Sequence, residues 1–110
     1  MPTKTQPADE KLLGRVNMAA YRLGAMHAAD LLDERTLTRL FNTIGAVDAI
    51  QSAQSKLHYS ATGSENEALE KRLDKPIRQL QRTFVRQVDA AIRKLDKSKL
   101  SQRNRKALGL

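Results

Sequence analysis

Apolar side chains return every three or four residues along most of the chain, the spacing that places them on one face of an α-helix. The first such stretch covers residues 8–33, with apolar positions at Leu12, Val16, Ala19, Ala20, Leu23 and Met26. The second covers residues 36–59, where Thr36 is expected to cap the helix N-terminus. The third covers residues 65–97. The pattern therefore predicts three helices.

The third stretch keeps one apolar register across a proline. Its apolar positions are Leu69, Leu73, Ile77, Leu80, Phe84, Val88, Ala91 and Leu95. Pro76 removes one backbone N–H, so it is expected to kink this helix or to mark a restart that Asp74 caps. The unbroken register favours a kink.

Three segments lack the helical pattern. Residues 1–7 are polar and are expected to be flexible, and residues 98–110 form a basic tail that is expected to be disordered when unbound. A linker around Gly63 precedes the third helix, where Ser64 and Glu67 have the spacing of a capping box. The sequence thus predicts one all-α domain, a small three-helix bundle with a long, kinked third helix and a basic C-terminal tail.

The predicted helix 36–59 has a second apolar face. This face contains Ala46, Ile50, Ala53 and Leu57. Two apolar faces are typical of a helix that lies between other helices or between subunits. We therefore expect this helix to be central, a homodimer to be possible, and Ile50 and Leu57 to be candidate protein-interaction residues.

The composition narrows the class of protein. The 110 residues include no cysteine, which excludes disulfides, thiol catalysis and cysteine zinc sites, and a cytoplasmic setting is expected. The N-terminus lacks the apolar core of a secretory signal, and Arg22, His27 and Asp30 interrupt the most apolar stretch. We expect no membrane span. Binding to a membrane surface is not expected either, since the apolar register of the third helix is needed for packing.

Positive charge is concentrated at one end of the chain. The net charge is +8, but residues 71–110 contain thirteen Lys or Arg and three Asp, whereas residues 1–70 contain seven basic and nine acidic residues. The net charge is therefore +10 for residues 71–110 and −2 for residues 1–70. A strongly basic segment favours an anionic partner, which could be nucleic acid, an acidic protein or anionic lipid.

Seven of the nine cations of the predicted third helix fall in one sector, opposite its apolar register. They are Lys71, Lys75, Arg78, Arg82, Arg86, Arg93 and Lys97, and the tail adds Arg103, Arg105 and Lys106. An unbroken helix would extend this line over about 39 Å, against about 34–36 Å for one turn of duplex DNA. Asp89 and Asp96 interrupt its C-terminal half. Because arginine pairs well with phosphate oxygens, we predict binding to the backbone of duplex nucleic acid, with little sequence preference.

Other binding modes fit less well. Single-strand stacking needs exposed aromatic side chains, and Phe41 and Phe84 occupy positions expected to be in the core. The compact turn of a helix-turn-helix motif is missing from the sequence, so base-specific recognition is not expected. Two alternatives stay open: a merely solvated basic face, and a non-enzymatic interaction module (an adaptor, inhibitor or assembly component) that binds an acidic partner protein.

No catalytic constellation is visible in the sequence. His27 and His58 are the only histidines, and a metal site would need Asp30, Glu34 or other carboxylates at spacings that nothing else in the sequence supports, so neither a metal nor another cofactor is expected. His27 precedes Asp30 by three residues, and a local hydrogen bond between the two is the preferred interpretation. The serines lack the context of a nucleophile, and no phosphate-binding loop occurs. We predict a protein that is not an enzyme.

Overall fold

The computed structural model describes the backbone of residues 7–60 and 64–110 and the side chains of residues 10–57 and 68–110. Over this part of the chain every regular secondary-structure element is a helix, which confirms the predicted all-α bundle. Its helices are α1 (Pro7–Ala28), α2 (Glu34–Ser60), α3 (Ser64–Arg93), the 3-10 helix η1 (Lys97–Lys99) and α4 (Gln102–Ala107). The predicted flexible segment 1–7, Pro7 excepted, and the predicted Ser64–Glu67 capping box lie outside the residues or side chains described.

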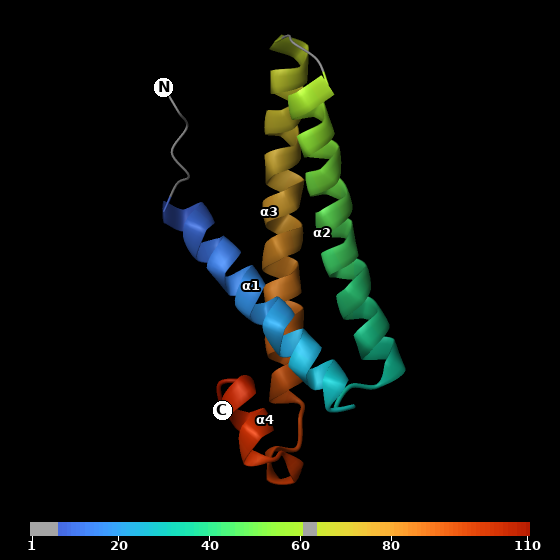
Figure 1. The fold of residues 1–110 in the computed structure, drawn as a ribbon, viewed down its shortest axis with the longest axis vertical. Helices are drawn as coiled ribbons and strands as arrows, with labels where there is room; N and C mark the ends of the chain where they lie inside the picture. Colours follow the sequence, from blue (N-terminus) through green and yellow to red (C-terminus); the bar gives the residue numbers. More distant parts are fainter. Residues whose placement is uncertain (1–6, 61–63) are drawn as a thin grey trace.

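The central helix is α3. The antiparallel helix α2 runs along most of its length, and α1 crosses its C-terminal half (Figure 1). Helices α1 and α2 meet near their connection, where the His27 and Phe41 rings pack edge to face with centroids 5.7 Å apart. The expectation that α2 would be central was therefore wrong, because it is α3 that packs against both of the other long helices.

The core lies where α1 crosses α3. It contains Leu12, Val16, Ala19, Leu23 and Met26 of α1, Leu40 of α2, Phe84, Val88, Ala91 and Ile92 of α3, and Leu100 and Leu108 from the C-terminal segment. The predicted apolar face of α1 is buried at every position except Ala20, which is exposed. Phe84 is fully buried as predicted, whereas Phe41 is 46% exposed, so its expected place in the core was wrong. Leu69 is also exposed, because α1 does not reach that end of the α2–α3 hairpin.

Helix α1 ends earlier than predicted, at Ala28 instead of residue 33. Asp30 adopts a left-handed conformation with φ of 55°. Its N–H donates to the His27 carbonyl, and the Leu31 N–H donates to the Met26 carbonyl. These two bonds form a Schellman motif, which stops a helix by satisfying its last carbonyl groups. The usual glycine signal is missing because aspartate occupies the left-handed position.

Asp33 caps the next helix. Its Oδ1 accepts a hydrogen bond from the Thr36 N–H at 3.1 Å, and α2 begins at Glu34. The expected capping role of Thr36 is therefore wrong, because Thr36 is the donor in this interaction and Asp33 is the cap. Hydrogen bonding from the Thr36 side chain, and then from its backbone N–H, lowers the pKa of Asp33.

Helix α3 continues through Pro76 without a break, so the proline marks no restart. The helix ends at Arg93 instead of residue 97. Asp96 then caps η1 by accepting hydrogen bonds from the Ser98 N–H at 3.1 Å and the Ser98 hydroxyl at 2.6 Å. Lys97 consequently belongs to η1 and no longer continues the surface of α3.

The C-terminal segment is folded, contrary to the expected disorder. The Ser101 Oγ accepts from the Asn104 N–H at 3.1 Å and caps α4. At the other end Gly109 adopts φ of 73°, and the Leu110 N–H donates to the Arg105 carbonyl at 2.8 Å. The reason for this order is apolar burial, since Leu100 and Leu108 join the core and hold α4 against α1.

Candidate nucleic-acid interface

The predicted cation line on α3 lies on the outside of the bundle. Lys71, Lys75, Arg82, Arg86 and Arg93 are exposed, and Arg78 is half-buried. At 1.5 Å per residue, the stretch from Lys71 to Arg93 spans about 33 Å, still close to one turn of duplex DNA. The geometry follows from the apolar register, because burying one side of α3 turns the opposite side to solvent.

Three arginines of this line, Arg82, Arg86 and Arg93, keep their positive charge uncompensated within the described structure. The Arg86 Nε donates to the Arg82 carbonyl at 3.4 Å, a contact that positions the side chain without cancelling its charge. Among the side chains that the structure describes, no carboxylate lies within ion-pair distance of Arg82, Arg86 or Arg93. Neighbouring cations of this kind sum to a positive potential that attracts anions.

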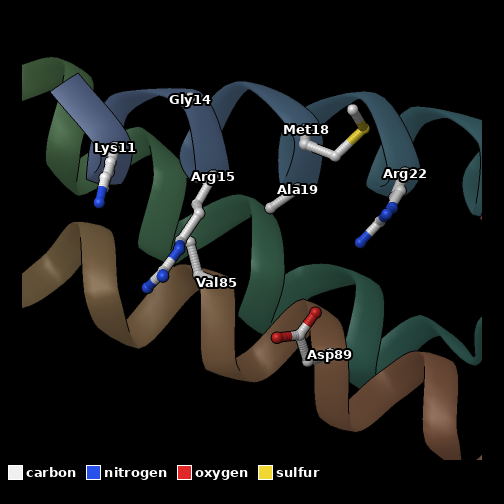
Figure 2. A pocket seen from close by; sticks show the side chains of 8 residues that line it. All are labelled: Lys11, Gly14, Arg15, Met18, Ala19, Arg22, Val85 and Asp89. Atoms are coloured by element: carbon white, nitrogen blue, oxygen red, sulfur yellow. The ribbon is translucent and has the colours of Figure 1, made fainter. Parts of the chain in front are cut away.

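A second set of cations comes from α1. Lys11, Arg15 and Arg22 extend from α1 toward α3, and the Val85 and Asp89 side chains extend from α3 toward α1 (Figure 2). These three cations were not among the predicted site residues, because residues 1–70 have a negative net charge. Their spacing of four and seven residues was the available signal, since it places all three on one flank of a helix.

Together the two helices form a cationic groove, which we call the α1–α3 groove. One part is lined by Lys11, Leu12, Arg15, Arg82, Val85 and Arg86. The adjoining part is lined by Lys11, Gly14, Arg15, Met18, Ala19, Arg22, Val85 and Asp89. Leu12 is buried and Val85 is half-buried, so apolar side chains form the floor while Lys11, Arg15, Arg82 and Arg86 are exposed above it. Asp89 is the sole acidic side chain among these lining residues.

The cations of the C-terminal segment are held in place by the fold. Arg103, Arg105 and Lys106 are exposed on α4. The Arg105 Nη2 donates to the Lys97 carbonyl at 2.6 Å, which ties α4 to η1. These residues were expected to be mobile contacts in a disordered tail, and that expectation was wrong because α4 is a docked helix.

Arg22 lies at the junction of the groove and the C-terminal segment. A Cβ atom added at Gly109 would lie 2.8 Å from the Arg22 Nη2, so the guanidinium packs directly against this glycine. The Arg22 Nε is buried and makes no hydrogen bond within the described structure. Arg22 therefore belongs to the packing between α1 and the C-terminus as well as to the groove.

The two residues predicted to contact a partner protein, Ile50 and Leu57, are both half-buried on α2. Close to them, the Gln54 Nε2 donates to the Glu70 carbonyl at 2.9 Å and to the Asp74 Oδ1 at 2.5 Å. This flank of α2 is thus partly covered by α3. More exposed apolar side chains occur on α1, where Leu13, Met18 and Tyr21 are each about half exposed.

The histidines do not form a metal site in the described structure. The His27 ring contacts Phe41, and the local hydrogen bond expected between His27 and Asp30 is a backbone one, from the Asp30 N–H to the His27 carbonyl at 3.1 Å. The His58 side chain lies outside the described residues. In the part of the chain that can be assessed, no three histidine or acidic side chains gather as metal ligands do. None of the helices described there has the length and apolarity to cross a membrane.

Comparisons with the models of known protein families, with curated proteins and with solved structures gave no match to this chain.

Proposed function

We propose that this protein binds the phosphate backbone of duplex nucleic acid through the outward face of α3, the flanking cations of α1 and the C-terminal helix α4. The observation that carries the proposal is the position of Arg82 and Arg86, which are exposed, not paired with a described carboxylate, and adjacent to Lys11 and Arg15. The proposed function is binding, with no catalytic step.

The backbone is the favoured target because of the side chains on this surface. Phosphate contacts from Arg and Lys fix a protein on a duplex but carry no sequence information. Base recognition in the major groove uses a helix whose side chains reach base edges, and the compact turn of a helix-turn-helix motif, which would position such a helix, is missing from the sequence. Single-strand binding needs stacked aromatic side chains, but Phe84 is fully buried, and the exposed Tyr21 and Phe41 line no part of the α1–α3 groove. We therefore infer recognition of charge and shape.

A salt titration tests this function. A protein that neutralises about six phosphates of B-DNA should show a log–log slope of affinity against salt near −5. The double variant Arg82→Gln/Arg86→Gln should bind more weakly and reduce the slope by about 2, one for each lost phosphate contact. Fluorescence anisotropy with a labelled duplex of DNA, and then of RNA, measures both quantities.

A matched control separates a local contact from total charge. Arg39 and Lys56 are exposed on α2, and neither lines the α1–α3 groove. The variant Arg39→Gln/Lys56→Gln removes the same two charges and should keep most of the affinity. Absence of binding by the unmodified protein to both duplexes at low salt would refute the proposed function.

The alternative function, an interaction module for an acidic partner protein, uses the same cations. The half-buried state of Ile50 and Leu57 gives it less support than the exposed arginines give to nucleic acid. Co-purification distinguishes the two. A stoichiometric protein partner that survives nuclease treatment would favour the interaction module.

A further inference from the structure

We propose that the α1–α3 groove is a phosphate site, in which Lys11 and Arg15 of α1 and Arg82 and Arg86 of α3 hold one backbone phosphate between the two helices. A phosphate bound there would fasten α1 to α3. This inference rests on the proposed binding of nucleic acid, and it assigns one phosphate of the backbone to a defined site between α1 and α3.

The groove brings cations together from two elements that are distant in the sequence. Each helix contributes two of the four side chains, and all four are exposed above the apolar floor of Leu12 and Val85. Figure 2 shows that Lys11 and Arg15 extend across the gap toward α3. An anion placed over the floor would therefore meet positive charge on both sides.

The like charges on the two facing helices repel each other. A negatively charged group bound between them would remove this repulsion. No acidic side chain lines the part of the groove described by these four cations. Asp89 lines the adjoining part, where Arg15 and Arg22 also lie, so the negative charge among the lining residues of the groove is confined to that end. The uncompensated end is consequently where an external anion gains most from binding.

A phosphate group fits this arrangement better than a carboxylate does. Three of the four side chains are arginines, whose planar forks match phosphate oxygens, and Lys11 adds a point charge. The oxygens of a phosphate point in tetrahedral directions and can be shared by donors on two helices. A carboxylate has two oxygens in one plane and is matched by a single arginine fork.

A phosphate that bridges the two helices would stabilise the packing of α1 on α3. Helix α1 packs mainly on α3, and near its C-terminal end on α4, while its recorded ring contact with α2 is at His27. The N-terminal half of α1 is therefore held in the bundle by its contact with α3. Repulsion between the groove cations of the two helices weakens this contact. A bound phosphate replaces this repulsion by attraction and links the docking of α1 to ligand binding.

Thermal unfolding in inorganic phosphate tests the site without nucleic acid. Against sodium chloride of equal ionic strength, a phosphate concentration ten times the Kd should raise the Tm of the unmodified protein by about 5 °C. Phosphate also stabilises proteins nonspecifically, so the informative quantity is the difference between variants. Lys11→Gln/Arg15→Gln should lose most of the rise, and the control Arg39→Gln/Lys56→Gln should keep it.

Duplex binding by the same variants completes the experiment. At low salt, Lys11→Gln/Arg15→Gln should bind a labelled duplex about tenfold more weakly than the unmodified protein, and the α2 control should bind within about twofold. Equal losses in the two double variants would overturn the groove site and leave the proposed function standing. A phosphate-dependent Tm rise that needs Lys11 and Arg15, in a protein that binds no duplex, would overturn nucleic acid as the source of the phosphate.

Removing a negative charge from the groove shows whether the weaker binding of the cation variants has an electrostatic cause or reflects misfolding. Asp89→Asn removes the acid from the groove and should strengthen duplex binding, whereas Asp48→Asn, at an exposed position on α2, should do so less. A structural defect would weaken binding in both cases. Equal affinities of the Asp89→Asn and Asp48→Asn variants would contradict the site.

Discussion

Replacing Leu108 with alanine tests the docking of the C-terminal helix, on which the positions of three proposed cations depend. Leu108 is 2% exposed and belongs to the core, although it lies two residues from the end of the chain. Burying a leucine side chain contributes about 1.5–3 kcal/mol, and truncation to alanine in a core costs about 2–5 kcal/mol. The short helix α4 can undock locally, which limits the cost to the free energy of its docking. We therefore expect about 2 kcal/mol, at the low end.

This magnitude is measurable. For a domain of this size, a loss of about 2 kcal/mol lowers the Tm by roughly 8 °C. Urea unfolding followed by circular dichroism gives the free energy, and hydrogen exchange of the Leu108 and Leu110 amides, which donate to the Asn104 and Arg105 carbonyls, reports on α4 itself. Protection of these amides should fall more than protection within α3.

The matched control is the neighbouring leucine. Leu110 is 46% exposed, so Leu110→Ala should cost less than about 1 kcal/mol. If Leu108→Ala is no more destabilising than Leu110→Ala, Leu108 is not buried and α4 does not dock as described.

Two further predictions concern helix ends. The pKa of Asp33 is lowered in the folded state, so its capping contribution is present above its unfolded pKa of about 3.9 and is lost as the pH falls through the lower, folded value. Asp33→Asn keeps a capping acceptor that does not titrate, and its free energy of unfolding should fall less than that of the unmodified protein between about pH 4 and pH 2; parallel curves in urea titrations would contradict the capping role. Gly109→Ala places an L-residue at φ of 73° and should cost about 1–2 kcal/mol, whereas Gly24→Ala, in helix α1 with no atom within 4 Å of the added Cβ, should stabilise by roughly 0.5–1 kcal/mol. Equal effects of the two glycine substitutions in thermal unfolding would argue against the left-handed turn at the C-terminus.

The number of long helices and their buried faces were predictable from local pattern. A face that must be buried repeats at the helical period. This period predicted the buried residues from Leu12 to Met26 and those around Phe84. The outward direction of Arg82 and Arg86 followed from the same register. Helix ends were less predictable, since Asp30 stops α1 in a conformation that sequence rules assign to glycine.

The C-terminal helix could be recognised in part. Ser101 and Gly109 are a usual N-cap and a usual C-terminal glycine, but six helical residues are too few to be stable alone. Burial of Leu100 and Leu108 against α1 supplies the stability, and that contact joins residues about 80 positions apart in the sequence.

The groove depended entirely on how the helices pack. A helical projection gives the angle of Lys11 and Arg15 about the axis of α1, and separately that of Arg82 and Arg86 about α3, but it contains no information on which flanks of two helices meet. That choice is made by the apolar side chains buried at the crossing, among them Val16 of α1 and Phe84 and Val88 of α3, whose burial sets the rotation of each helix. Local periodicity therefore specified the helices, whereas non-local packing brought their cations together.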